Sequence, residues 1–236
     1  MRRWKRRTVS GSPEAALGGP VARPKDAATL ILIDRSRGDT RVLLGRRAAA
    51  HAFMPGLYVF PGGRRDAGDF RRPFASDLHP LVTEKLLASN RRPMTVRGAR
   101  ALALAAIREL AEETGLQFGG QQSSTGDTSG AAELASLRYV ARAITPPGFP
   151  RRYDTRFFLT FTDEAGIDPS HIRDSRELLD LQWLDIGDIS CLNMPDITKM
   201  VLGDVIELMK AGPSLGFGRA VPFYFLRRGL PVRHML

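Results

Sequence analysis

The chain has 236 residues, of which 43% are hydrophobic and 25% charged, so it can form the core of one globular domain. A fully disordered chain and a disulfide-stabilised scaffold are both excluded, because apolar residues are plentiful and Cys191 is the only cysteine. The net charge is +10 at pH 7, and half of it lies in residues 1–26, which carry seven basic and two acidic side chains. The rest of the chain is only mildly basic, which favours an anionic ligand and does not require a nucleic acid.

Residues 1–26 are expected to form a flexible basic tail, followed by one domain over 27–212 and a C-terminal extension over 213–236. The tail lacks the continuous apolar stretch of an export signal, and an organellar transit peptide is the alternative to a solvated extension. No apolar run approaches the roughly 20 residues of a membrane span. The final residues His234-Met235-Leu236 differ from a peroxisomal Ser-Lys-Leu address, and a cytoplasmic location is expected.

The predicted elements alternate irregularly between strands and helices. Residues 28–33 and 41–46 predict a hairpin, and residues 57–60 predict a short strand that Pro61-Gly62-Gly63 ends through backbone freedom. Residues 70–97 have the character of an insertion. The remaining expected elements are a helix over 78–88, a loop over 119–130, strands over 137–145, 155–161 and 179–184, and a last helix over 194–211. This order indicates an α/β fold with a mixed sheet flanked by helices.

The strongest helical pattern runs from Ala99 to Thr114, and Gly115 follows where a left-handed cap is expected. One face carries Ala103, Ala106, Ile107, Leu110 and Thr114, which predicts that it packs in the core. Another face carries Glu109, Glu112 and Glu113, which repel one another near a helix C-terminus that already disfavours anions. Arg108 relieves part of this repulsion. A divalent cation would relieve the rest, and oxygen ligands without His or Cys indicate Mg²⁺ or Mn²⁺; the alternative is a solvated, glutamate-rich helix end.

The string from Arg108 to Leu116 resembles the second half of the Nudix hydrolase box, Arg-Glu-U-x-Glu-Glu-x-Gly-U with U aliphatic, at every defined position. Gly63, followed after five residues by Asp69, resembles the first half, with aspartate where the family usually has glutamate. Residues 70–107 number 38 where the compact box has seven, so an insertion of 31 residues would divide the box.

This resemblance implies the Nudix α/β/α sandwich and metal-dependent hydrolysis of a diphosphate. It implies that Glu109, Glu112 and Glu113 bind Mg²⁺ or Mn²⁺ together with the Gly63 carbonyl, and that Arg108 orients a glutamate. Nudix enzymes often use one more acidic residue from a later segment. The candidate is Glu177, with Asp174 as the second choice, and a solvated turn is the alternative for both.

Residues 43–63 are similar to the signature of the coenzyme A diphosphatase branch, with Leu43-Leu44-Gly45-Arg46-Arg47 and Phe60-Pro61-Gly62-Gly63 in its spacing. Gly45 and Ala52 depart from the usual Thr and Arg. Residues 144–158 resemble the same branch. Planar guanidinium groups suit phosphate oxygens. The expected substrate contacts are Arg47, Gly62, Gly63, Arg151, Arg152 and Arg156.

The implied reaction converts coenzyme A or acyl-CoA to 3',5'-ADP and a 4'-phosphopantetheine. The first alternative is hydrolysis of ADP-ribose, dinucleotides or nucleotide sugars, and the second is a non-catalytic Nudix module that binds a ligand or RNA. The intact acidic triplet argues against the second, because a binding module needs no mutually repelling carboxylates. A small diphosphate is thus the expected partner, without membrane or nucleic acid. Phe223, Tyr224 and Phe225 either pack the extension onto the domain or form a homodimer contact.

Overall fold

A computed structural model describes residues 22–49, 54–88, 93–119, 131–189 and 192–236. Most of the expected tail, most of the expected loop over 119–130, Ala52 and Cys191 lie outside these ranges. The helices are η1 Ala67–Arg71, α1 Pro80–Ala88, α2 Val96–Thr114, η2 Pro169–His171 and α3 Asp196–Ala211. The strands are β1 Lys25–Asp34, β2 Arg41–Arg47, β3 Tyr58–Val59, β4 Gly62–Arg64, β5 Phe74–Ser76, β6 Ala132–Glu133, β7 Arg138–Ile144, β8 Tyr153–Phe161, β9 Leu178–Asp185, β10 Pro222–Arg227 and β11 Leu230–Met235.

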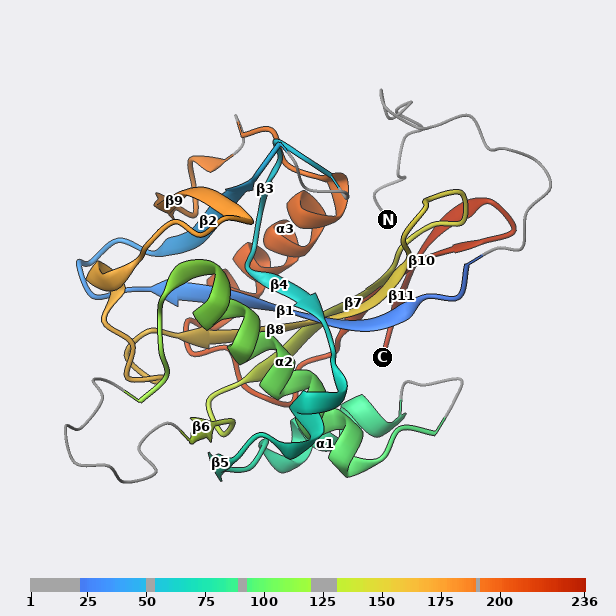
Figure 1. Ribbon diagram of the computed structural model, residues 1–236, viewed down its shortest axis with the longest axis horizontal. Coiled ribbons are helices and arrows are strands. Elements are labelled where there is room, and N and C mark those ends of the chain that lie inside the picture. Colours follow the sequence, from blue (N-terminus) through green and yellow to red (C-terminus); the bar gives the residue numbers. More distant parts are fainter. Residues whose placement is uncertain (1–21, 50–53, 89–92, 120–130, 190–191) are drawn as a thin grey trace.

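The strands other than β5 and β6 form one mixed sheet in the order β11-β10-β7-β8-β1-β2-β3, with β4 also paired to β1 and β9 to β2. β1 pairs with β8, and β10 with β7, in parallel, and the other pairs in this sheet are antiparallel. Helices α1 and α2 cover one face of the sheet and α3 covers the other (Figure 1). This three-layer arrangement confirms the predicted α/β sandwich with a mixed sheet.

The two core layers follow from side-chain alternation along β1. Leu30 and Leu32 belong to the cluster that includes α2, whereas Ile31 and Ile33 belong to the cluster that includes α3. All four side chains are fully buried. Because both faces of β1 are covered, residues 30–33 form an unbroken apolar run.

Helix α2 begins three residues earlier than the pattern predicted. Thr95 caps it by accepting a hydrogen bond from the Gly98 N–H at 3.0 Å. Gly115 ends it in the left-handed region at φ 75° and donates its N–H to the Ala111 carbonyl, which confirms the predicted cap.

The predicted short strand does end before Pro61, at Val59, but Gly62 and Gly63 lie within the next strand, β4, and pair with Thr29 and Ala28 of β1. Neither glycine has a positive φ. A Cβ at Gly62 would lie 2.7 Å from the Ala28 carbonyl oxygen, and one at Gly63 would lie 2.3 Å from Glu109 Oε1. Glycine is therefore required here by the close approach of β1 and α2, and not by an unusual backbone conformation.

The C-terminal extension completes the sheet, because β10 pairs with β7 and β11 pairs with β10. Tyr224 is buried, and the rings of Phe223 and Phe225 lie 4.6 Å apart between centroids. The structure therefore shows these residues packing the extension onto the domain, and a homodimer contact stays a prediction.

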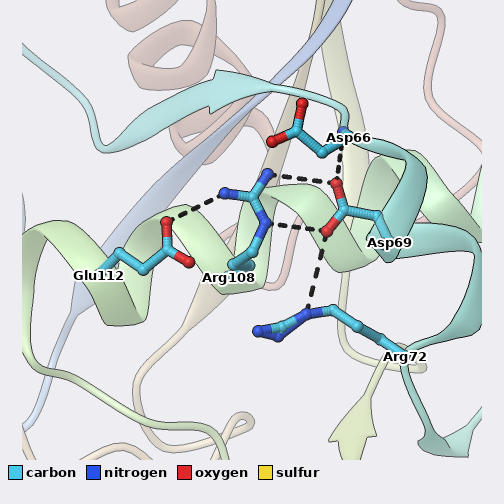
Figure 2. Close-up of a pocket in the computed structure, with 6 residues that line it drawn as sticks. Asp66, Asp69, Arg72, Arg108 and Glu112 are labelled. Carbon is cyan, nitrogen blue, oxygen red and sulfur yellow. Dashed lines mark hydrogen bonds and ion pairs between the residues drawn. The ribbon is translucent and has the colours of Figure 1, made fainter.

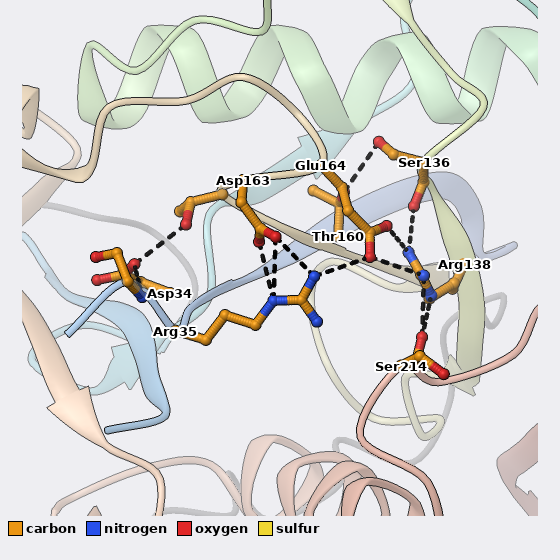
Figure 3. A network of polar contacts seen from close by, with 10 residues as sticks. Asp34, Arg35, Ser136, Arg138, Thr160, Asp163, Glu164 and Ser214 are labelled. Atoms are coloured by element: carbon orange, nitrogen blue, oxygen red, sulfur yellow. Dashed lines mark hydrogen bonds and ion pairs between the residues drawn. The ribbon is translucent and has the colours of Figure 1, made fainter. Parts of the chain in front are cut away.

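Arg138 of β7 holds the segment that leads into this extension (Figure 3). Its buried guanidinium donates hydrogen bonds to the Ser214 carbonyl at 2.9 Å and the Leu215 carbonyl at 2.6 Å, and pairs with Glu164 at 2.6 Å. Removing it leaves the buried Leu215 carbonyl without this donor, which costs free energy.

We therefore expect Arg138→Met to lower the free energy of unfolding by about 3 kcal/mol in urea denaturation. The matched control is Arg35→Met, because Arg35 forms a more exposed ion pair with Asp163 at 2.7 Å in the same network. That pair should contribute less than about 1 kcal/mol. Equal losses in the two variants would contradict the role given to Arg138.

Candidate active site

The acidic side chains of α2 point in different directions because successive helical residues turn by roughly 100°. Glu113 faces the sheet and is 6% exposed, whereas the side chains of Glu109 and Glu112 are 14% and 57% exposed. The three carboxylates therefore pass from the interior to the surface across one turn.

Glu113 is the buried member of this set. Its Oε2 accepts a hydrogen bond from the Gly62 N–H at 2.8 Å. Burial raises the pKa of Glu113 to about 8, although the Gly62 N–H and the positive charge of Arg47 partly oppose this change. The carboxylate is thus held against β4 in surroundings that disfavour its charge.

Glu109 lies against the backbone of β4 at Gly63, where no side chain intervenes. Loss of solvent raises the pKa of Glu109, and the neighbouring charges of Glu112 and Glu177 act in the same direction. Arg108 opposes the shift. The pKa values of two neighbouring glutamates are therefore raised, which is typical of a site built to bind a cation or to move a proton.

Arg108 connects helix α2 to the segment that follows β4, because it contacts both Glu112 and Asp69 (Figure 2). Its Nη1 donates to Glu109 Oε1 at 2.8 Å and to Glu112 Oε2 at 3.0 Å. Arg108 thus contacts two of the three glutamates, and its role in orienting them stays a prediction. Its Nη2 also donates to the Arg64 carbonyl at 2.9 Å, which ties α2 to the end of β4.

Asp69, to which the sequence assigned no definite role, is a partner of Arg108. It is 1% exposed within η1 and accepts hydrogen bonds from Arg108 Nε at 2.9 Å and Nη2 at 3.2 Å. These bonds hold the pKa of Arg108 well above its ordinary value. The five-residue spacing from Gly63 singled out Asp69 in the sequence but predicted no contact with Arg108. Beside the pair lies a cavity of about 520 Å³ lined by Asp66, Gly68, Asp69, Arg72, Arg108 and Glu112 (Figure 2).

The turn before β9 brings a further acidic residue to the glutamates of α2. The negative charge of Glu177 contributes to the raised pKa values of both Glu109 and Glu113. Asp174 has another task, because its two carboxylate oxygens accept the N–H groups of Asp180 and Leu181. Of the two acidic candidates, Glu177 is the one whose charge acts on the site.

Arg47, at the end of β2, is the basic residue that the structure brings to these glutamates. Burial lowers the pKa of Arg47, while the charges of Glu113, Glu177 and Glu109 oppose that effect. A guanidinium at this position can neutralise part of the acidic cluster or pair with a phosphate oxygen.

The other arginines expected to bind phosphate have different surroundings. Arg156 is 2% exposed and donates from Nη1 to Asp26 Oδ1 and to the Asp154 carbonyl, both at 2.8 Å. Arg152 donates to the carbonyls of Thr145 and Ala22. Arg151 is exposed. Arg152 and Arg156 therefore make contacts around the first residues of β1 and β8, and their role as substrate contacts stays a prediction.

The donor set fits a hard divalent cation in its chemistry. Among the described residues, no group of three or more His, Cys, Asp or Glu side chains is already arranged around one point. Glu109 and Glu113 nevertheless offer carboxylate oxygens whose pKa values are raised chiefly by burial, and a bound cation would favour their charged forms. Mg²⁺ and Mn²⁺ prefer such ligands and retain water molecules, so a complete protein cage is not required.

The raised pKa of Glu113 predicts how stability depends on pH. From its ordinary value of 4.5 up to about 8, the unfolded chain loses a proton that the folded protein retains. The free energy of unfolding of the metal-free protein should therefore fall as pH rises from about 5 to 8, by at most roughly 1.4 kcal/mol per pH unit from this group. Urea denaturation in EDTA checks this. Glu113→Gln should flatten the decline, and an equally steep decline in that variant would contradict the assignment.

A known structure is similar in fold to this chain, whereas no protein-family model and no curated protein matches the sequence. A Nudix hydrolase from Alicyclobacillus acidocaldarius is 28% identical, with a TM-score of 0.55 over 82% of this chain and 98% of that one. The Nudix domain of Shewanella oneidensis NrtR, solved with ADP-ribose, is 13% identical over 79% of this chain and 88% of that one, with a TM-score of 0.46. A MutT Nudix hydrolase from Burkholderia pseudomallei is 16% identical over 78% and 99%, with a TM-score of 0.46.

The Alicyclobacillus acidocaldarius protein is a Nudix hydrolase, and its likeness to this chain supports the fold of that class and an enzyme that acts on diphosphate bonds. Nudix hydrolases generally use divalent metal ions, in agreement with the carboxylate donors described above. No helix in the described part of the chain is both long and apolar enough to span a membrane.

Proposed function

We propose that this protein hydrolyses the diphosphate of coenzyme A or an acyl-CoA, giving 3',5'-ADP and a 4'-phosphopantetheine. The observation that carries the proposal is the gathering of Glu109, Glu113, Glu177 and Arg47 beside Gly62 and Gly63. The strings around Arg47 and Gly63 have the spacing of the coenzyme A diphosphatase signature.

The departure at Gly45 has a structural reason that is compatible with this proposal. A Cβ at Gly45 would lie 2.4 Å from Leu178 Cγ and 2.8 Å from Leu181 Cδ2. Both leucines are buried. Packing of β9 therefore explains glycine at this position, without any change in the residues that face the acidic cluster.

Each polar residue of the site has a role in the proposed reaction. Glu109 and Glu113 would hold a divalent cation together with the Gly63 carbonyl and, after its side chain turns inward, Glu112. The bound cation would neutralise the diphosphate oxygens and make water easier to deprotonate. Arg108 orients Glu109 and Glu112, and Arg47 pairs with the diphosphate. Glu177 takes the proton from a water whose oxygen attacks phosphorus, and the bridging P–O bond breaks to release the second phosphate.

Product identification is the direct test of this function. The full chain with Mg²⁺ is incubated separately with coenzyme A, acetyl-CoA, ADP-ribose, a diadenosine polyphosphate and UDP-glucose, and the products are identified by mass spectrometry. Release of 3',5'-ADP from coenzyme A, abolished by EDTA, is expected. Rapid turnover of ADP-ribose with coenzyme A left intact would instead support the first alternative, hydrolysis of ADP-ribose, dinucleotides or nucleotide sugars. Inertness toward every compound, with salt-sensitive RNA binding that depends on residues 1–26, would support the non-catalytic alternative.

A further inference from the structure

Strand β9 contains a β-bulge where it pairs with β2, in the upper left of Figure 1. Leu44 pairs with Gln182 and Arg46 pairs with Leu179, so Gly45 alone lies opposite Asp180 and Leu181. Asp180 has a φ of 51°, in the left-handed region that few residues other than glycine adopt. Bulges of this kind occur near active sites, where they change the direction of a neighbouring side chain.

Asp174 accepts hydrogen bonds from the backbone N–H groups of this bulge. Its Oδ2 accepts the Asp180 N–H at 2.8 Å and its Oδ1 accepts the Leu181 N–H at 3.0 Å. These are the two residues that lie opposite a single residue of β2, where the ladder is interrupted. One carboxylate therefore replaces the missing ladder partner and favours the left-handed conformation of Asp180.

The chain between Asp174 and the bulge is a short turn that carries Glu177. Ser175 donates its N–H to the Leu178 carbonyl at 2.9 Å, and its Oγ accepts the N–H groups of Glu177 at 3.2 Å and Leu178 at 3.0 Å. The Glu177 carbonyl accepts the Ala48 N–H at 3.0 Å. The backbone of Glu177 is thus fixed on both sides, by the bulge and by the residue that follows β2.

The small size of Gly45 is also needed for the turn that carries Glu177. The buried side chains of Leu178 and Leu181 occupy the space where a Cβ of Gly45 would lie. Residue 178 directly follows Glu177, and residue 181 belongs to the bulge. A larger residue at position 45 would therefore displace the same turn that Asp174 holds.

We propose that Asp174 is a positioning residue that holds Glu177 against Glu109 and Glu113 by capping the β9 bulge. This inference rests on the proposed function, in which Glu177 takes a proton during hydrolysis. Asp174 itself does not act on the substrate, because both of its carboxylate oxygens are engaged by the backbone.

A double-mutant cycle tests the proposal. With coenzyme A as the first probe, or whichever diphosphate the product assay identifies, Asp174→Ala should lower kcat by about 10 to 100-fold with little change in KM, because Glu177 is displaced and not removed. In the Glu177→Gln background the same substitution should have almost no further effect on kcat. Equal fold-losses in both backgrounds would show a general structural role and overturn the proposal.

Matched variants keep the test independent of a folding defect. Asp174→Asn keeps one acceptor oxygen and should retain more activity than Asp174→Ala. Asp168→Ala removes an exposed aspartate that caps the neighbouring η2 turn through Ser170, and it should leave kcat unchanged. Amide exchange followed by NMR should show faster exchange at Asp180 and Leu181 in Asp174→Ala but not in Asp168→Ala; unaltered exchange would overturn the proposal.

These experiments distinguish failure of the proposed function from failure of the role given to Asp174. If the wild-type protein hydrolyses a diphosphate and the cycle is additive, only the role of Asp174 fails. If Glu177→Gln keeps wild-type kcat, the proton acceptor and its positioning residue both fail while the enzyme assignment stands. If the wild-type protein hydrolyses none of the diphosphates, the proposed function fails.

Discussion

Replacing Glu113 by glutamine is expected to lower kcat on the order of 10³-fold, equivalent to about 4 kcal/mol of transition-state stabilisation. The amide removes a carboxylate that would hold the cation, while its oxygen can still accept the Gly62 N–H. In metal-free buffer at pH 8 the same variant should be more stable than the wild type. The reason is that burial raises the pKa of Glu113, which shows that its charge is unfavourable in the fold.

Steady-state kinetics with saturating Mg²⁺ and urea denaturation in EDTA measure the two effects. Glu84→Gln is the matched control, because Glu84 is an exposed glutamate on helix α1. It should change neither kcat nor stability appreciably. Wild-type turnover in Glu113→Gln would remove this residue from the site, and a loss of stability would contradict the electrostatic account of the helix.

Replacing Arg108 by leucine should lower both activity and stability. The substitution removes the close charged partner of buried Asp69 and leaves it the longer contact with Arg72 at 3.9 Å; loss of a close partner typically costs about 3–5 kcal/mol. It also releases Glu109 and Glu112 from the nitrogen that orients them, so kcat should fall by about 100-fold or more.

The double variant Asp69→Leu/Arg108→Leu separates these effects. Removing both members of a buried pair avoids an isolated charge, so urea denaturation should show that much of the lost stability returns. Activity should not return, because the glutamates still lack Arg108. If the double variant is as unstable as Arg108→Leu alone, the Asp69 contact does not explain the loss; recovery of kcat would contradict an orienting role.

Sequence reasoning succeeded where a local pattern determined the structure. The periodicity of α2, the Gly115 cap and the hairpin of β1 and β2 depend on residues close in sequence, and the structure confirms each. The start of α2 at Val96 was missed because Thr95, a capping residue, precedes the apolar pattern.

The features that the sequence did not reveal depend on contacts between distant segments. Gly62 and Gly63 resembled a strand end until β1 and α2 were placed against them. Asp174 resembled a second acidic candidate, because only the strand pairing shows that a bulge uses both of its oxygens. Arg156 likewise resembled a phosphate ligand, whereas the parallel pairing of β1 with β8 brings Asp26 to it. Spacing within a short stretch of sequence does not encode these contacts between distant segments.

Binding of Mn²⁺ followed by electron paramagnetic resonance most directly tests whether the carboxylates beside Gly62 and Gly63 form a cation site. The wild-type protein should remove free Mn²⁺ from solution at near-neutral pH, and Mg²⁺ should compete for the same site. Glu109→Gln and Glu113→Gln should each weaken binding at least tenfold, a change of about 1.4 kcal/mol, while Glu84→Gln binds as the wild type does. Equal Mn²⁺ affinity in all four proteins would contradict the account.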